Sequence, residues 1–372
     1  MKIGLSMNSV FNHNGTIKNI DGIGIYTLNL YQSLIKQNLA VEKILFNVSK
    51  STIAPEFVSA VNPLYSLAPG NYYKQLSSRI DLLHITDYRV PKVKNIPIVS
   101  TIHDAIMLKN PQWNSSTKPV AYLKQIILKK MADQADKIIT VSQAIISDIV
   151  NYWNIPENKI VAIHHGIEEK WFNRLSSEAA KKILAKYQIT KPFLLTVGTL
   201  QPRKNIERII EAYLSLPKIL TDNHDLLIVG KKHDSLTEPR LVDQIQRLTK
   251  KHSIRWLQYL PHNDLQCLYQ NACLLLYPSL AEGFGFPILE AFASETPVIT
   301  SNFGSMAEIS DDAAYLVDPY AESNIAEAII NLLEKPDLRD QFINRGKIQV
   351  KKFTWEQCAK KTIEVYRKII GL

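Results

Sequence analysis

One stretch of sequence decides the fold class: Leu274-Leu-Leu-Tyr-Pro-Ser-Leu-Ala-Glu-Gly-Phe-Gly-Phe-Pro-Ile-Leu-Glu290. It opens with an apolar run, which is typical of a parallel strand buried on both faces. A glycine-containing loop follows, and Pro287 then stands where proline is favoured, in the first turn of a helix. The stretch therefore predicts one strand–loop–helix unit of a parallel α/β sheet.

Similar apolar runs recur along the whole chain, with helical stretches between them. In the first half they are 3–7, 44–48, 82–86, 97–102, 137–142 and 160–164. In the second half they are 193–198, 226–230, 254–260, 274–278, 297–301 and 314–317. This alternation predicts two doubly wound, Rossmann-like domains, 1–174 and 175–353. The amphipathic segment 354–372 begins with Thr354 as an N-cap, and we expect it to cross back to the first domain.

Composition narrows the class of protein. The 372 residues are 46% hydrophobic and 21% charged, which is the balance of a soluble globular chain. Three cysteines without CxxC spacing favour a reducing compartment and no zinc site. The first ten residues lack a signal-peptide pattern, and no run of 18 apolar residues occurs. We therefore expect a cytoplasmic protein.

Positive charge gathers in the first half. Residues 1–175 carry 19 Lys and Arg against 12 Asp and Glu, which is +7 of the total +9. This excess suggests a phosphorylated acceptor, an anionic membrane at its inner face, or a nucleic acid; a solvated basic face explains it equally well. The segment 118–131 could rest on lipid or pack on its own sheet. Aromatics interleaved with a basic patch are lacking, so we expect no nucleic-acid partner.

The loop of the opening stretch has the chemistry of an anion site. Gly283 and Gly285 allow backbone to approach a ligand closely. The N–H groups at the helix start favour a phosphate or hydroxyl oxygen. Glu282 and Glu290 frame this notch, and paired carboxylates suit a polyhydroxyl ligand. A capped helix with a solvated glutamate is the alternative.

A second motif, Val197-Gly-Thr-Leu-Gln-Pro-Arg-Lys-Asn205, follows the first strand of the second domain. Open α/β sheets bind ligands at this end of their strands. Arg203 can grip a diphosphate with its planar fork, and Lys204 can add a point charge. Solvated side chains on a surface loop are the alternative.

Candidates in the first half are weaker. Asp21-Gly-Ile-Gly24 is an incomplete glycine motif at a helix start, where a phosphate contact and a plain helix start both remain open. His103-Asp104 ends a predicted strand and could contact substrate or move protons, or simply be hydrogen-bonded there. Ser142 and His165 end two further strands at the same edge.

Several chemistries are missing from the sequence. It has no GxxxxGK[ST] loop, no HExxH, no GxSxG and no DxD-type metal clamp. Kinase, zinc-protease and serine-hydrolase functions are therefore excluded. We expect no cofactor and no required metal ion.

Together these motifs resemble the retaining GT-B glycosyltransferases of family 4, and in particular their mannosyltransferase-like branch. The resemblance covers nearly the whole chain. Besides the two motifs above it includes Thr101-Ile-His-Asp104, Ile139-Thr-Val-Ser142, His165-Gly-Ile167, Thr296-Pro-Val-Ile-Thr-Ser301 and Phe353-Thr-Trp355. It implies two Rossmann-like domains facing across a cleft, with a nucleotide diphosphate sugar held mainly by the second.

The resemblance also implies roles for single residues. Glu290 would hold the ribose hydroxyls and Glu282 the hydroxyls of the donor sugar. Arg203 and Lys204 would neutralise the leaving diphosphate, and His103 would touch the transferred sugar. Further implied donor contacts are Gly24, Thr199, Gly230, Lys231, Tyr259, Gly283, Phe284, Gly285, Phe286 and Ile288. The candidates on the acceptor side are Asp104, Ser142 and His165.

The implied reaction is metal-independent, retaining transfer of a hexose to a glycan or lipid-linked acceptor in cell-surface polysaccharide or lipopolysaccharide synthesis. Mannose is favoured, with GDP-mannose as donor. The segment Asn302-Phe-Gly-Ser-Met-Ala-Glu308 departs from the glycine-rich turn of many relatives, which leaves neighbouring donor contacts open. A nucleotide-sugar epimerase, with His103 and Asp104 as its acid–base pair, is the alternative enzyme. A non-enzymatic nucleic-acid binder is the third hypothesis.

Overall fold

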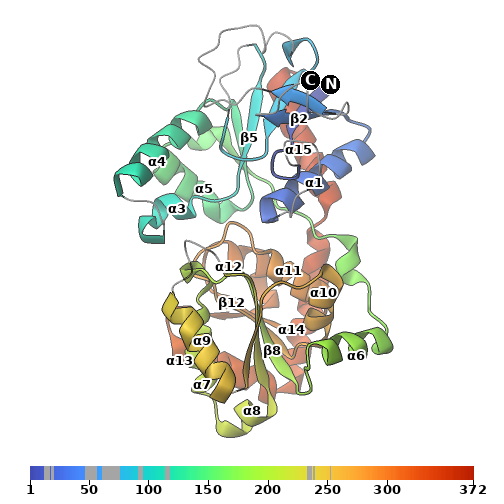
Figure 1. Cartoon of the computed structure of the whole chain (residues 1–372). Coiled ribbons are helices and arrows are strands. Elements are labelled where there is room, and N and C mark those ends of the chain that lie inside the picture. The colour runs from blue at the N-terminus through green and yellow to red at the C-terminus, as the bar shows by residue number, and fades with distance from the viewer. Residues whose placement is uncertain are drawn as a thin grey trace. The chain divides into compact units, whose positions relative to one another are not determined.

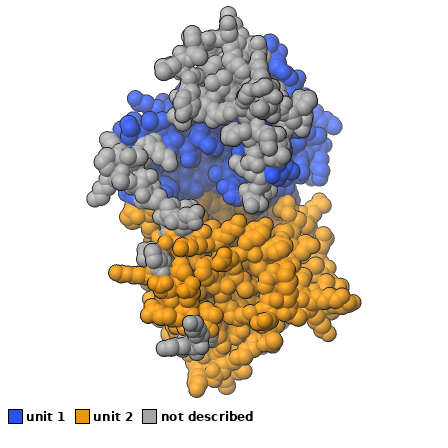
Figure 2. Space-filling model, in the orientation of Figure 1, with its two compact units in different colours: residues 1–111, 116–166, 353–372 blue, residues 112–115, 167–352 orange. Residues whose placement is uncertain are grey.

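The computed structural model describes residues 1–11, 17, 21–46, 57–60, 76–90, 95–113, 118–232, 237, 239–251 and 253–372. Contacts between residues divide the chain into two compact units, coloured separately in Figure 2. Unit 1 comprises residues 1–111, 116–166 and 353–372, and unit 2 comprises residues 112–115 and 167–352. Each unit contains one parallel sheet, so each is described by itself.

The sheet of unit 1 has seven strands in the order β3-β2-β1-β4-β5-β6-β7. They are β1 (Lys2–Ser6), β2 (Ala40–Phe46), β3 (Phe57–Ala60), β4 (Leu82–Ile85), β5 (Ile98–Ile102), β6 (Lys137–Thr140) and β7 (Ile160–Ala162). All neighbouring pairs are parallel. The strand order reverses between β1 and β4, which is the switch point where such sheets bind ligands.

Five α-helices of unit 1 lie within the described residues. They are α1 (Gly22–Lys36), α3 (Ile106–Lys109), α4 (Lys118–Ala132), α5 (Ile146–Asp148) and α15 (Trp355–Ile370). The Asp21 side chain caps α1 by accepting from the N–H of Gly24, at 3.0 Å. The Thr354 hydroxyl caps α15 by accepting from the N–H of Gln357, at 3.1 Å, as the sequence predicts. Figure 1 shows α15 packed beside α1, so the chain's last helix does return to the first unit.

The sheet of unit 2 has six parallel strands in the order β10-β9-β8-β11-β12-β13. They are β8 (Phe193–Val197), β9 (Asp225–Val229), β10 (Ile254–Leu257), β11 (Leu274–Tyr277), β12 (Val298–Ser301) and β13 (Tyr315–Val317). Its switch point lies between β8 and β11. Strands β9, β11 and β12 are buried along their whole length, as expected for parallel strands that are covered on both faces.

Helices cover both faces of this second sheet (Figure 1). They are α6 (Ser177–Lys186), α7 (Ile206–Leu214), α8 (Lys218–Asn223), α9 (Pro239–Lys251), α10 (His262–Asn271), α11 (Phe286–Ala293), α12 (Gly304–Ser310), α13 (Glu322–Glu334) and α14 (Pro336–Gln349). The helices α7, α9 and α13 lie on one face and α10 and α11 on the other. Apolar side chains of α7, α9 and α13 form a core with the face of the sheet that they cover, and unit 1 has a core of its own.

The predicted fold class is confirmed: two doubly wound α/β units, with the last helix on the first. Predicted strand limits differ from the observed ones by a few residues, and positions 47–48 of one predicted strand lie outside the described residues. The elements without a counterpart in the prediction include β3, α3, α8 and α14. Strand β3 has only four residues, and α14 has too few apolar positions to show a helical stripe.

Candidate active site

The predicted donor residues of unit 2 follow four neighbouring strands at their carboxyl ends. Tyr259 follows β10; Gly230 and Lys231 follow β9; Thr199, Arg203 and Lys204 follow β8; and Glu282 follows β11. Carboxyl ends of parallel strands meet at one edge of the sheet, where open α/β sheets bind ligands. The loops with Arg203 and Glu282 flank the switch point itself.

The loop after β8 is shaped to bury Lys204. Gly198 has a φ of +151°, and a Cβ at this position would lie 3.0 Å from Cε of Lys204. A side chain there would therefore crowd the lysine. Residues Pro202–Lys204 form a single 3-10 turn, and Lys204 is buried at its end.

Asn205 locks this turn to the rest of unit 2. It adopts a left-handed conformation with a φ of +60°, which asparagine tolerates better than most residues. Its side-chain amide donates to the carbonyls of Pro278 and Pro319, at 3.0 and 2.8 Å. Asn205 is thus a structural residue that fixes where Arg203 and Lys204 stand.

Arg203, Lys204 and Glu282 form one ion cluster rather than two independent groups. The ammonium of Lys204 donates to Oε1 of Glu282 at 2.5 Å and to the hydroxyl of Tyr277 at 2.7 Å. The guanidinium of Arg203 donates to the other carboxylate oxygen of Glu282, and its Nε donates to Gln201 at 2.9 Å. Both oxygens of Glu282 therefore accept from a cation.

Burial and charge tune this cluster together. Burial alone would raise the pKa of Glu282, but Arg203 and Lys204 outweigh it and lower the pKa to about 2. Burial lowers the pKa of Lys204 to about 8, with Glu282 acting in the opposite direction. The side chains of Glu282 and Lys204 are each only 9% exposed, so solvent screens their interaction weakly. At neutral pH the cluster has a fixed carboxylate and two cations.

Glu290 has a different environment, although the same motif carries it. It lies in α11, and its Oε2 accepts from the Tyr269 hydroxyl at 2.8 Å. Burial raises the pKa of Glu290 to about 7, although the hydrogen bond from Tyr269 acts in the opposite direction. Glu290 is therefore partly protonated at neutral pH, and can both donate to and accept from a hydroxyl group.

The loop before α11 brings backbone to the same edge. Gly285 precedes the helix with a φ of +126°, a conformation that few other residues adopt, and it offers no side-chain cap. The rings of Phe284 and Phe286 meet edge to face at 5.3 Å. Ile288 is fully buried, and its N–H donates to the carbonyl of Gly285 at 3.0 Å. The Ile288 side chain packs under the loop against Gly285, and its donor contact stays a prediction.

Gly230 has a structural explanation. A Cβ at this position would lie 1.7 Å from the carbonyl oxygen of Gly198, because the loops after β8 and β9 pass backbone to backbone. Lys231 and Tyr259 are exposed, and the Lys231 ammonium stands 4.5 Å from the centre of the Tyr259 ring. This pair presents a flat aromatic surface with a cation beside it, which suits stacking of a planar base.

Two of the unit 1 candidates, His103 and His165, lie against the ring of Tyr26, which is buried. The His103 ring meets it edge to face at 5.0 Å, and the His165 ring lies 4.6 Å away. Nε2 of His103 is 3.0 Å from the carbonyl oxygen of Thr86 and therefore donates to it, so the neutral ring has Nδ1 as its acceptor. Burial lowers the pKa values of both histidines. Both are neutral at physiological pH.

The other unit 1 candidates are placed as follows. Asp104 accepts from the N–H of Ile106 at 3.0 Å and caps the turn after β5. Ser142 is fully buried at the end of β6. The N–H of Gly24 is already bonded to the Asp21 side chain, so its predicted phosphate contact would have to share that donor.

Three tyrosines and one histidine that contact these groups or their neighbours were missed by sequence reasoning: Tyr26, His84, Tyr269 and Tyr277. Each lies in a strand or helix among the apolar residues of a core segment. Tyr277 is the last residue of β11 and follows three leucines, so the sequence pattern predicts a plain core residue there. The only sequence signal for Tyr277 was its position at the carboxyl end of a strand, where ligand-binding residues gather.

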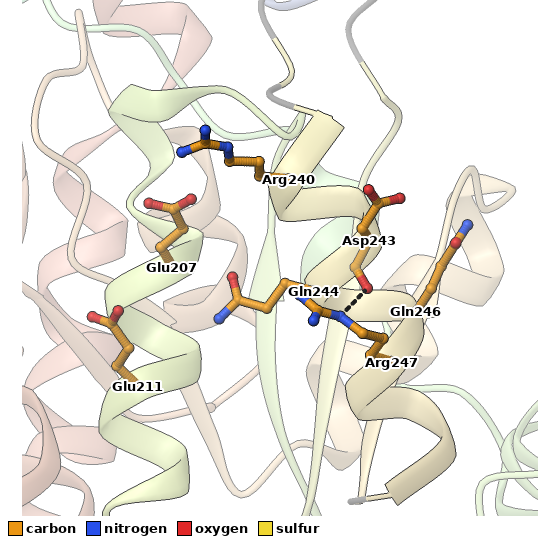
Figure 3. Close-up of a pocket in the computed structure, with 7 residues that line it drawn as sticks. All are labelled: Glu207, Glu211, Arg240, Asp243, Gln244, Gln246 and Arg247. Carbon is orange, nitrogen blue, oxygen red and sulfur yellow. Dashed lines mark hydrogen bonds between the residues drawn. The ribbon is translucent and has the colours of Figure 1, made fainter.

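A groove of about 830 Å³ lies between α7 and α9 (Figure 3). Its lining side chains are hydrophilic and of mixed charge: Glu207, Glu211, Arg240, Asp243, Gln244, Gln246 and Arg247. None of them belongs to the predicted site. The groove therefore gives no argument for the position of the donor.

Within the described part of the chain, no group of three or more His, Cys, Asp or Glu side chains is arranged to hold a metal ion. None of the described helices has the length and hydropathy needed to cross a bilayer. The three cysteines are free thiols.

Two family models match the chain. Residues 178–349 match the model of glycosyl transferases group 1, and residues 20–171 match that of glycosyltransferase family 4. The O-antigen chain mannosyltransferase B of Escherichia coli is 33% identical over 270 residues, which are 72% of this chain and 70% of that protein. The O-antigen chain mannosyltransferase RfbU of Salmonella typhimurium is 28% identical over 263 residues, covering 71% and 68%.

Solved structures agree with the architecture. Anabaena HepE in complex with UDP-glucose superposes with a TM-score of 0.73 at 18% identity, covering 99% of this chain and 100% of that one. A likeness at this identity concerns the fold, and it confirms the GT-B class. The sequence matches go further: this chain belongs to glycosyltransferase family 4.

Proposed function

We propose that this family 4 glycosyltransferase moves a hexose, with mannose favoured, from a nucleotide diphosphate sugar to a glycan or lipid-linked acceptor, with retention of configuration. The single observation that carries the proposal is the Arg203–Lys204–Glu282 cluster at the switch point of unit 2. It offers two cations where a leaving diphosphate would gain charge, and a carboxylate for sugar hydroxyls. Mannose is favoured because the two O-antigen relatives described above are named mannosyltransferases.

The chemistry follows from charge. Breaking the bond between sugar and phosphate builds negative charge on the diphosphate, and fixed cations stabilise that charge without reorganising. Arg203 and Lys204 are held in place by Asn205 and Glu282 before any ligand arrives. Glu290 and the ring of Tyr259 would hold ribose and base. The attacking hydroxyl would lose its proton to the leaving phosphate.

The test is transfer with purified protein. GDP-mannose, UDP-glucose and a dTDP-sugar are each offered with a mannoside-terminated acceptor, and the product is analysed by mass spectrometry and by NMR of its anomeric proton. We expect the α-linked product from GDP-mannose. In Arg203→Ala, kcat should fall about 100- to 1,000-fold, because a preorganised donor is lost. The matched control is Arg247→Ala, an exposed arginine of α9. Near-normal rates in Arg203→Ala would refute the site.

The epimerase alternative is tested in the same assay. Incubation with a nucleotide sugar alone would give a new sugar and free nucleotide if the enzyme were an epimerase. The transferase should need its acceptor for turnover. Substantial turnover without acceptor would replace the proposal by the alternative.

Membrane contact is a further part of the proposal. Helix α4 exposes Leu123 and Ile127, which are one helical turn apart, and has Lys129 and Lys130 in its last turn. This arrangement suits an anionic bilayer surface at the inner face of the membrane, with the enzyme in the cytoplasm. Sedimentation with anionic vesicles should fall in Leu123→Glu. Absence of binding at low salt in the unmodified protein would refute this part.

A further inference from the structure

Four buried side chains of unit 1 form a continuous chain of hydrogen bonds. The Tyr366 hydroxyl lies 2.6 Å from Nδ1 of His84, and Nε2 of His84 lies 2.8 Å from the Thr101 hydroxyl. The Thr101 hydroxyl is in turn 2.8 Å from the Tyr26 hydroxyl. The four residues come from α15, β4, β5 and α1, and none is more than 1% exposed. The chain of bonds therefore ties the last helix to the first through the centre of the sheet.

The direction of these bonds follows from proton counting. Burial lowers the pKa of His84 to about 3, so its ring is neutral and has one donor and one acceptor nitrogen. The Tyr366 hydroxyl makes no other hydrogen bond with any residue that the structure describes, so its proton is satisfied only by donating to Nδ1. Nε2 of His84 then carries the proton and donates to Thr101.

This chain of bonds ends on the ring that flanks His103. Tyr26 meets the His103 ring edge to face at 5.0 Å and the His165 ring at 4.6 Å. Packing restricts the χ angles of a buried tyrosine ring, and a hydrogen bond to its hydroxyl restricts them further. Here Thr101 holds the hydroxyl, and His84 in turn fixes the Thr101 rotamer.

We propose that His84 and Thr101 are positioning residues for His103: by anchoring the Tyr26 hydroxyl they hold the ring against which His103 packs, and so fix the place and the protonation of His103. His84 touches no proposed substrate group itself. Its action passes through Thr101 and Tyr26. The kinetic part of this inference rests on the proposed function; the packing part does not.

Protonation of His103 provides a readout that a merely structural role would not move. Burial lowers its pKa, while the Thr86 carbonyl and nearby carboxylates raise it. The titratable groups that face it are Asp21, Asp87, Asp104, His84, His165 and Tyr26. If the Tyr26 ring is released, water reaches the imidazole, its desolvation falls, and the pKa should rise toward 6.5.

The experiment is an NMR titration of His103 in the full chain, with its signals assigned from a His103→Gln spectrum. Thr101→Val keeps the volume and removes both hydrogen bonds of the hydroxyl, and we expect the His103 pKa to rise by about 0.5 to 1 unit. Thr362→Val is the matched control, because it removes another fully buried threonine hydroxyl of unit 1, which bonds only within α15. The control should leave the titration unchanged.

Tyr366→Phe provides the second variant, in case Thr101→Val does not fold. It removes only the first bond of the chain, and should move the His103 titration in the same direction by a smaller amount. An unchanged His103 titration in the folded variants would overturn the inference, even if transfer activity is found. Equal shifts in Thr362→Val would overturn it too, since the effect would then be general.

Kinetics give the second readout. With the donor and acceptor identified, kcat of Thr101→Val should fall about tenfold while KM for the donor changes less than about twofold, because misplacing one contacting group slows the reaction without weakening remote binding. His84→Gln keeps an acceptor and a donor on one amide and should recover most of the rate that His84→Leu loses. Equal rates in these two variants would refute the positioning role.

Discussion

The two glutamates of one motif should have opposite effects on stability when each is replaced by glutamine. The folded pKa of Glu282 is about 2, below the ordinary value of 4.5. Its ionised form is therefore favoured in the fold, and this contribution is present above pH 4.5 and lost as pH falls toward 2. A difference of about 2.5 units at about 1.4 kcal/mol each gives roughly 3.5 kcal/mol. Glu282→Gln should lose about this much at pH 5, where Lys204 keeps its charge, and less at pH 8.5, where Lys204 has lost most of it.

For Glu290 the sign is reversed. Its folded pKa is about 7, above the ordinary 4.5, so the fold favours the protonated form. That contribution is present below pH 4.5 and lost as pH rises through 7. Above pH 7 the folded protein carries a poorly solvated carboxylate. Glu290→Gln removes it and should stabilise the protein by about 2 kcal/mol at pH 8.5, less than the full shift implies because the side chain keeps some solvent contact.

The assay is urea unfolding followed by tryptophan fluorescence at pH 8.5 and pH 5. Glu327→Gln, an exposed position in the middle of α13, is the control and should stay within about 0.5 kcal/mol of the unmodified protein. The gain in Glu290→Gln should shrink at pH 5, where the native side chain is already protonated. Destabilisation by both substitutions at pH 8.5 would refute the protonation assigned to Glu290. If Glu282→Gln leaves the free energy of unfolding unchanged, the stabilising ion cluster is refuted.

Three other substitutions probe the same edge of unit 2. In the free enzyme Lys204 loses its charge as pH rises through about 8, so kcat/KM for the donor should fall over the same range. Lys204→Arg should remove this fall in rate. A profile of the unmodified enzyme that stays flat to pH 10 would contradict the pKa assigned to Lys204. Gly230→Ala places a Cβ within 1.7 Å of the Gly198 carbonyl and should cost at least about 3 kcal/mol in urea unfolding, whereas Gly22→Ala meets nothing within 4 Å and should be harmless. Asn205→Ala leaves two buried carbonyls unpaired and should cost about 2 to 4 kcal/mol; a loss below about 0.5 kcal/mol would contradict its structural role.

Strand–helix alternation was enough to predict both sheets and the return of the last helix. Parallel strands buried on both faces have unbroken apolar runs, and β9 and β11 show the clearest ones. The limits of exposed or short strands were less accurate. In β2 the first half is only partly buried, so its sequence loses the pattern on which the prediction relies.

For the candidate site, the sequence could predict which loops lie at one edge of the sheet, but not how their side chains contact one another. The motifs, together with their positions after predicted strands, placed Arg203, Lys204 and Glu282 at the carboxyl edge of the sheet. Their mutual ion pairs depend on the spacing of β8 and β11, which no local pattern contains. Tyr277 and Tyr269, which hydrogen-bond the lysine and Glu290, are single aromatic positions within core segments. These hydrogen-bond partners come from other elements of unit 2, so they can be identified only from the three-dimensional structure.

This network changes what a ligand must provide. Arg203 and Lys204 already bind Glu282, so a diphosphate has to compete with that carboxylate for the same two cations. A carboxylate that loses its partners in a poorly solvated place costs several kcal/mol unless other donors replace them. The hydroxyls of a sugar attached to the diphosphate are such donors, whereas a nucleoside diphosphate alone has none to offer at that position. The cluster should therefore favour the complete nucleotide sugar over the nucleotide product, and release of the diphosphate would be assisted when Glu282 regains its cations.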